Sequence, residues 1–93
     1  MNDRELLELA ANAYLDNSWH GNEAYMRGFM ATWNPLVDDG DALRLAVQAG
    51  VDISFAQAVH HEETGSAGYR ADPHAFTRRA IVRAAAEIGR RMK

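Results

Sequence analysis

The run of residues 33–47 constrains the fold of this chain more than any other stretch, because an aromatic residue and a proline turn stand directly before an amphipathic pattern. Pro35 has a fixed φ, and its ring disfavours the helical region for Asn34. The pair is therefore a turn signal. We expect Trp33 to be buried where it fixes the approach to the following helix, so that truncating it to alanine would cost about 3–5 kcal/mol.

A short helix is predicted directly after this turn, over residues 40–49. Asp38 or Asp39 can cap its first backbone N–H groups. Apolar residues recur at helical spacing within the range. Gly50 follows in the position where a left-handed residue commonly ends a helix. This element therefore has recognisable signals at both of its ends.

Two further helices are predicted near the ends of the chain. Over residues 3–16, apolar residues recur at helical spacing after a capping residue. Over residues 73–91, an apolar face opposes an arginine face. Asp72 can cap this last helix, and Pro73 occupies its first turn, where the missing N–H has no cost.

Alternation of residue types predicts a strand over residues 51–60. Apolar residues alternate there with polar or small ones, which is the period of a half-buried strand. After a polar connector that contains glycine, residues 69–70 can return as a second strand of a hairpin. The prediction is one α+β domain, residues 1–93, with a small antiparallel sheet of about two to four strands packed against three helices.

Residues 19–33 are compatible with two structures. Alternation places Tyr25, Phe29 and Trp33 on one face of a strand, with Gly28 where another backbone comes close. Helical spacing places the same aromatic residues and two methionines on one stripe nearly as well. We prefer the strand and keep the helix as the alternative.

Length and composition restrict the classes of function. At 93 residues the chain has room for one modest core. It contains no cysteine, which excludes disulfides, thiolate metal sites and cysteine nucleophiles. Residues 1–5 are too charged for a secretory signal, and no apolar run approaches the roughly 20 residues that span a bilayer. We therefore expect a cytoplasmic protein with no membrane association.

Charge is unevenly distributed along the chain. Residues 1–65 hold eleven acids against three arginines, whereas residues 72–93 hold six bases against two acids, within a net charge of −3. Such asymmetry can mark an acidic surface that mimics nucleic acid, or a basic helix that holds phosphate. It can also reflect attraction between the two halves in the fold, which is the interpretation we favour.

Three aspartates, Asp38, Asp39 and Asp41, crowd the predicted start of helix 40–49. One acid is enough for the cap, so the others would be surplus to folding and would raise self-repulsion. A calcium loop would need a closing glutamate where Ala49 stands, so no calcium site is predicted. We predict instead that these acids form a surface that binds a basic partner protein.

Arg79, Arg83 and Arg90 fall on one face of the predicted helix 73–91. Such a face can bind an anion such as phosphate, and each phosphate contact adds salt dependence. The interspersed Glu87 and the net negative charge argue against strong affinity for nucleic acid. The arginines are therefore candidates for an anion-binding site.

No catalytic or metal-binding motif is recognisable. On a strand, His60 and His61 would point to opposite faces, and the four histidines do not have the spacing of metal ligands. The chain has neither a glycine-rich phosphate loop nor a Gly-x-Ser-x-Gly turn. We expect no enzyme activity, no metal and no cofactor.

Most of the chain resembles small proteins encoded by tailed phages and prophages of proteobacteria, and more distantly the NinX-like phage proteins. The resemblance rests on Trp-Asn-Pro-Leu at 33–36, Asp-Asp-Gly-Asp-Ala-Leu at 38–43 and the arginine- and alanine-rich segment 72–88, and the segment 5–10 fits it too. It carries over no catalytic residue. It implies a phage-encoded protein that works in the host cytoplasm.

The resemblance also implies that the protein acts by binding, as phage proteins of this size commonly do. We expect a non-catalytic protein that inhibits or modulates a host protein or defence complex, with anti-CRISPR activity among the anti-defence versions. The alternative is a module that binds a nucleotide or phosphate ligand through the arginine face of residues 73–91. The sequence leaves open whether the chain forms a homodimer.

Overall fold

The computed structural model of this chain describes residues 2–15 and 22–92. Six helices account for most of these residues: α1 (Asp3–Tyr14), α2 (Glu23–Thr32), α3 (Asp39–Ala49), α4 (Ile53–Thr64), α5 (Ala67–Ala71) and α6 (Pro73–Arg91). No strand occurs in the described residues. The predicted α+β class is therefore wrong, and the fold is a small helical bundle.

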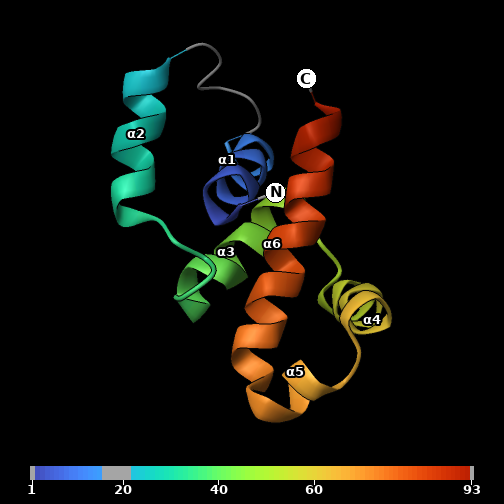
Figure 1. Ribbon diagram of the computed structural model, residues 1–93. Coiled ribbons are helices and arrows are strands. Elements are labelled where there is room, and N and C mark those ends of the chain that lie inside the picture. The colour runs from blue at the N-terminus through green and yellow to red at the C-terminus, as the bar shows by residue number, and fades with distance from the viewer. Residues whose placement is uncertain (1, 16–21, 93) are drawn as a thin grey trace.

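Helix α6 is the axis around which the other helices are arranged (Figure 1). The helices α1, α3, α4 and α5 all pack against it, and α1 makes the most extensive contact. Helix α1 also contacts α3. By contrast, α2 makes few contacts with any other described helix and lies on the far side of α1 from α6 in Figure 1.

The three predicted helices are present as α1, α3 and α6, and their caps explain where they begin. Asn2 and Glu5 form a reciprocal capping box at the start of α1. The Asp38 side chain caps α3, and the left-handed Gly50, with φ 74°, ends it. Asp72 caps α6 by accepting from a backbone N–H of the first turn. Residue 16, the predicted end of the first helix, lies outside the described residues.

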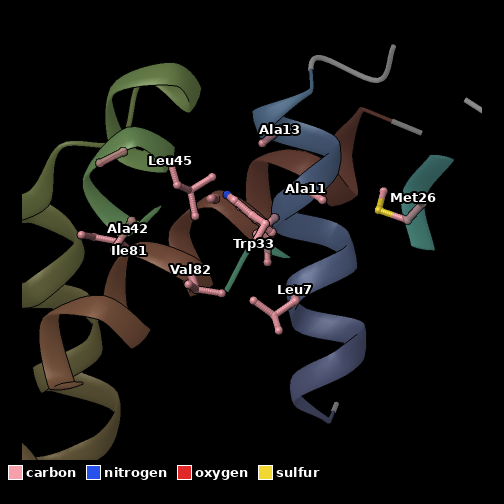
Figure 2. Close-up of a cluster of buried hydrophobic side chains, with 13 residues drawn as sticks. Leu7, Ala11, Ala13, Met26, Trp33, Ala42, Leu45, Ile81 and Val82 are labelled. Carbon is pink, nitrogen blue, oxygen red and sulfur yellow. The ribbon is translucent and has the colours of Figure 1, made fainter. Parts of the chain in front are cut away.

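The hydrophobic core lies where α1, α3 and α6 meet (Figure 2). Trp33 is only 5% exposed, so its predicted burial is confirmed. Its ring centroid lies 5.5 Å from that of Tyr14 and 4.8 Å from that of Phe29. The other buried members of the core are Leu7, Ala10, Ala11, Ala13, Met26, Ala42, Leu45, Ala46, Ile81, Val82, Ala85 and Ala86.

The prediction of a strand over residues 51–60 is wrong, because most of this segment belongs to α4. The Asp52 carboxylate accepts from the N–H of Phe55 at 3.0 Å and caps the helix. Ala56 and His60, one turn apart, are buried. The neighbouring segments are helical as well, so this segment has no described strand to pair with. A helix satisfies its backbone internally, and α6 supplies the surface that covers one face of α4.

The two remaining strand predictions are also corrected. Residues 69–70 lie within α5 and form no hairpin. Residues 19–21 lie outside the described residues, and the rest of the range 19–33 is mostly α2, so the helical alternative is confirmed there. Asn22 begins α2 by accepting from the N–H of Tyr25 at 2.9 Å.

Candidate functional site

A groove of about 660 Å³ opens between α4 and α6 and reaches the start of α1. We call it the α4–α6 groove. Its lining comprises Leu6 and Leu9 from α1, Phe55, Ala56, Val59, His60, Glu63 and Thr64 from α4, and Arg79, Ala80, Arg83, Ala84, Ala86, Glu87 and Arg90 from α6.

The floor and the rim of the α4–α6 groove differ in character. The buried lining side chains are three alanines and one histidine: Ala56, Ala80, Ala86 and His60. Phe55 and Val59 stand one turn apart on α4 and remain 69% and 40% exposed. A solvent-exposed apolar rim therefore borders a floor of small residues.

The arginines predicted as an anion site, Arg79, Arg83 and Arg90, all line this groove. They share one face of α6 because their spacing follows the helical period. Helical periodicity is a local property, so the sequence could group them before the fold was known. What the sequence did not show is that α4 and the start of α1 face them.

Each of these arginines already has an acidic partner. The ion pairs are Arg79–Asp3 at 3.1 Å, Arg83–Glu63 at 3.1 Å and Arg90–Glu87. The hydrogen bond with Arg90 is also the main cause that lowers the pKa of Glu87. All six side chains are substantially exposed, so solvent screening keeps these pairs weak.

His60 is the buried titratable residue of the groove. Its Nδ1 lies 3.1 Å from Nη1 of Arg83, and its ring centroid lies 4.6 Å from that of Phe76. Arginine can only donate, so Nδ1 accepts and the neutral ring carries its proton on Nε2. Burial, followed by the charges of Arg83 and Arg79, lowers the pKa of His60. The site therefore favours the neutral form of this histidine.

The three aspartates predicted as a partner surface have separate structural roles. Asp38 caps α3 by accepting from the N–H groups of Gly40 and Asp41. Asp41 is buried and accepts from the N–H of Asn34 at 2.9 Å and from Arg44 at 2.6 Å. It therefore ties the proline turn to the first turn of α3.

Asp39 connects α3 to α6. It accepts from Arg78 at 2.6 Å and lies 3.3 Å from Nδ1 of His74. These two hydrogen bonds, with that of Arg78 the stronger, lower the pKa of Asp39. The premise that two of the three acids are surplus to folding is therefore wrong. Their role in partner binding stays a prediction.

Asp39 also lies at a smaller hollow of about 280 Å³, the α3–α6 pocket. Its lining residues are Asp39, Ala42, Leu43, Ile53, Pro73, His74, Thr77, Arg78 and Ile81. The structure thus separates the two predicted sites, since the arginines line the α4–α6 groove and Asp39 lines the α3–α6 pocket.

Sequence reasoning missed Phe55 and Val59 because the strand interpretation placed them on a buried face. Their four-residue spacing was the available signal, because on a helix it puts both side chains on one side. For metal binding, no group of three or more histidines and acids comes together within residues 2–15 and 22–92. No helix in the same residues is both long and apolar enough to cross a membrane.

Compared with protein-family models, curated proteins and solved structures, the chain shows no significant match. The resemblance to phage proteins therefore stays a prediction, and the site must be interpreted from its own geometry.

Proposed function

We propose that the chain is a non-catalytic binding protein that holds a partner protein in the α4–α6 groove. The observation that carries this proposal is the pair Phe55 and Val59, exposed one turn apart at the rim of the groove. A single exposed apolar side chain is ordinary. Two that border a concave, alanine-floored surface are typical of a site that a partner covers.

The resemblance to phage proteins supports a host protein or a defence complex as the partner. In this proposal the chain acts in the host cytoplasm and inhibits or modulates the host component by covering part of its surface. Binding alone is sufficient for this role, so no chemistry by the chain is required.

The test is capture from host lysate by the wild-type chain and by two matched variants. Phe55→Glu places a charge at the rim of the groove. Val47→Glu makes the same change at a residue of α3 that is 74% exposed and lines neither the groove nor the α3–α6 pocket. We expect a host protein to be retained by the wild type and by Val47→Glu and lost by Phe55→Glu.

The captured protein is then purified, and its binding is measured by calorimetry. Loss of the Phe55 contact and the charge introduced in its place should weaken binding by about tenfold or more for Phe55→Glu. Equal capture and equal affinity for Phe55→Glu and wild type would refute the groove as the binding site.

A second candidate function is binding of a phosphate-bearing small molecule, favoured by the presence of all three arginines in the same groove. It ranks second because Glu63 and Glu87 line the groove too and would repel a phosphate. Titration with inorganic pyrophosphate tests it. Heat of binding that disappears in Arg83→Gln would support this function, and absence of heat for the wild type would exclude it.

A further inference from the structure

We infer that the α4–α6 groove accepts an amphipathic α-helix of the partner, with acidic side chains along the flank that faces α6. This inference rests on the proposed function and goes further, because it specifies the conformation and the charge pattern of the bound segment.

The dimensions of the groove match a helix of three turns. Its α6 wall extends from Arg79 to Arg90, which corresponds to about 16 Å at the rise of an α-helix. Its α4 wall presents Phe55, Val59 and Glu63 at successive turns. Side chains repeated at each turn of α6 form a ridge that fits between the side-chain rows of a further helix.

The floor of the groove selects a helix over an extended segment. Ala56, Ala80 and Ala86 present methyl groups, which neither donate nor accept hydrogen bonds, and His60 is the polar side chain buried beside them. An extended peptide pressed onto them would bury backbone N–H and C=O groups without partners, at a cost in free energy. A helix satisfies these groups internally, and the small floor residues let its backbone approach closely.

The charges of the two walls predict the orientation of the bound helix. The α6 wall carries three arginines and one glutamate, Glu87, and so keeps a net positive charge, whereas the charged residue of the α4 wall is Glu63. Among the described residues, Arg79 uses only Nη2, on Asp3, so most of its five donors can bind a further carboxylate. Because the internal ion pairs are exposed and weak, partner acids can share or replace them at low cost.

The experiment is selection from a random peptide library long enough for three helical turns, with the purified chain as bait. Peptides that also bind Phe55→Glu are removed, so that those retained depend on the groove. We expect apolar residues at helical spacing and acidic residues along one flank of the consensus. The consensus peptide should gain helicity on binding, as measured by circular dichroism.

Variants then test the contacts of the consensus peptide. Arg90→Gln should weaken binding about threefold to tenfold at low salt, with the difference shrinking as salt screens the exposed charges. Val47→Glu should leave the affinity within about twofold of wild type, as expected for a surface substitution outside the interface.

The outcomes separate this inference from the proposed function. Groove-dependent peptides whose apolar residues lack helical spacing, or whose flank carries basic in place of acidic residues, would overturn the inference. The proposed function would still stand in that case. A library from which no groove-dependent peptide emerges overturns the inference, while capture of a host protein tests the proposed function independently. If the chain is a dimer in solution and Phe55→Glu makes it monomeric, the groove holds a second copy, which overturns both.

Discussion

Gly89 lies where the backbones of α1 and α6 approach each other closely. A Cβ atom at this position would lie 1.8 Å from the carbonyl oxygen of Leu9 and 3.1 Å from the Cβ of Asn12. A backbone carbonyl cannot move aside as the end of a flexible side chain can. Any residue larger than glycine therefore forces the two helices apart.

We expect Gly89→Ala to lower the free energy of unfolding by about 1–3 kcal/mol or more, as overpacking of a tight core does. Gly28→Ala is the matched control, because a Cβ at Gly28 in α2 meets nothing within 4 Å. Alanine favours a helix interior, so this control should gain about 0.5–1 kcal/mol. Urea unfolding measures both variants, and a similar effect of the two would contradict the close approach.

Trp33 combines favourable burial with one unfavourable polar group. Its ring packs among the aromatic residues of the core, but Nε1 is buried and has no hydrogen-bond partner within the described residues. An unpaired buried donor reduces the stability that the ring provides.

We expect Trp33→Ala to lower the free energy of unfolding by about 3–5 kcal/mol. Trp33→Phe should lose much less, because it keeps an aromatic ring and removes the unpaired N–H. Chemical denaturation followed by circular dichroism compares the two variants. A loss for Trp33→Phe as large as that for Trp33→Ala would contradict this expectation.

At the scale of elements, α4 joins α6 through a histidine contact that we expect to respond to pH. His60 attaches α4 to α6 as a neutral acceptor for Arg83, and its pKa is lowered by burial and by the neighbouring arginines. In the unfolded chain the pKa of this histidine returns to about 6.5. Below this pH, the unfolded state takes up a proton that the folded state resists.

Stability should therefore be fully present above about pH 6.5 and should fall as the pH decreases toward the folded-state pKa of His60. The window above pH 5 lies clear of most titration of aspartate and glutamate. Between pH 5 and about pH 6.5, the free energy of unfolding should decrease with falling pH in the wild type. The same slope should appear in His61→Gln, which alters an exposed neighbour. In His60→Gln the slope should be largely abolished, and a persistent slope would assign it to another group.

At the scale of the whole molecule, the basic last helix is tied to the acidic elements that precede it. The ion pairs Arg79–Asp3, Arg78–Asp39 and Arg83–Glu63 join α6 to α1, α3 and α4. The favoured interpretation of the charge asymmetry, attraction between the two halves of the chain, is therefore confirmed. Because of this pairing, the acidic groups of a partner must compete with the chain's own acids to bind the arginines of the α4–α6 groove.

The helices of the bundle are unequally supported. Helix α6 buries seven residues and contacts four other helices, whereas α2 buries only Met26 and makes few helix contacts. Local opening is easiest where few apolar contacts must break. We expect the backbone amides of α2 to exchange with solvent much faster than those at the centre of α6, as measured by native-state hydrogen exchange. Equal protection would show that α2 opens only with the whole fold.

The elements that could be predicted from sequence are those whose signals are local. Caps, a proline turn and a terminal glycine delimit α1, α3 and α6, because each acts within one or two turns of backbone. The arginine face of α6 is predictable for the same reason. The burial of Trp33 was also recognised, from its place before the turn.

The tertiary structure decided what depends on neighbours distant in sequence. A strand needs a partner strand, and residues 51–60 have none among the described residues, so the capped helix α4 forms against α6. The exposure of Phe55 and Val59, and the meeting of α4 with the arginine face, follow from that docking. Residue pattern sets which faces a segment can present, but only packing against other elements determines which of them is covered.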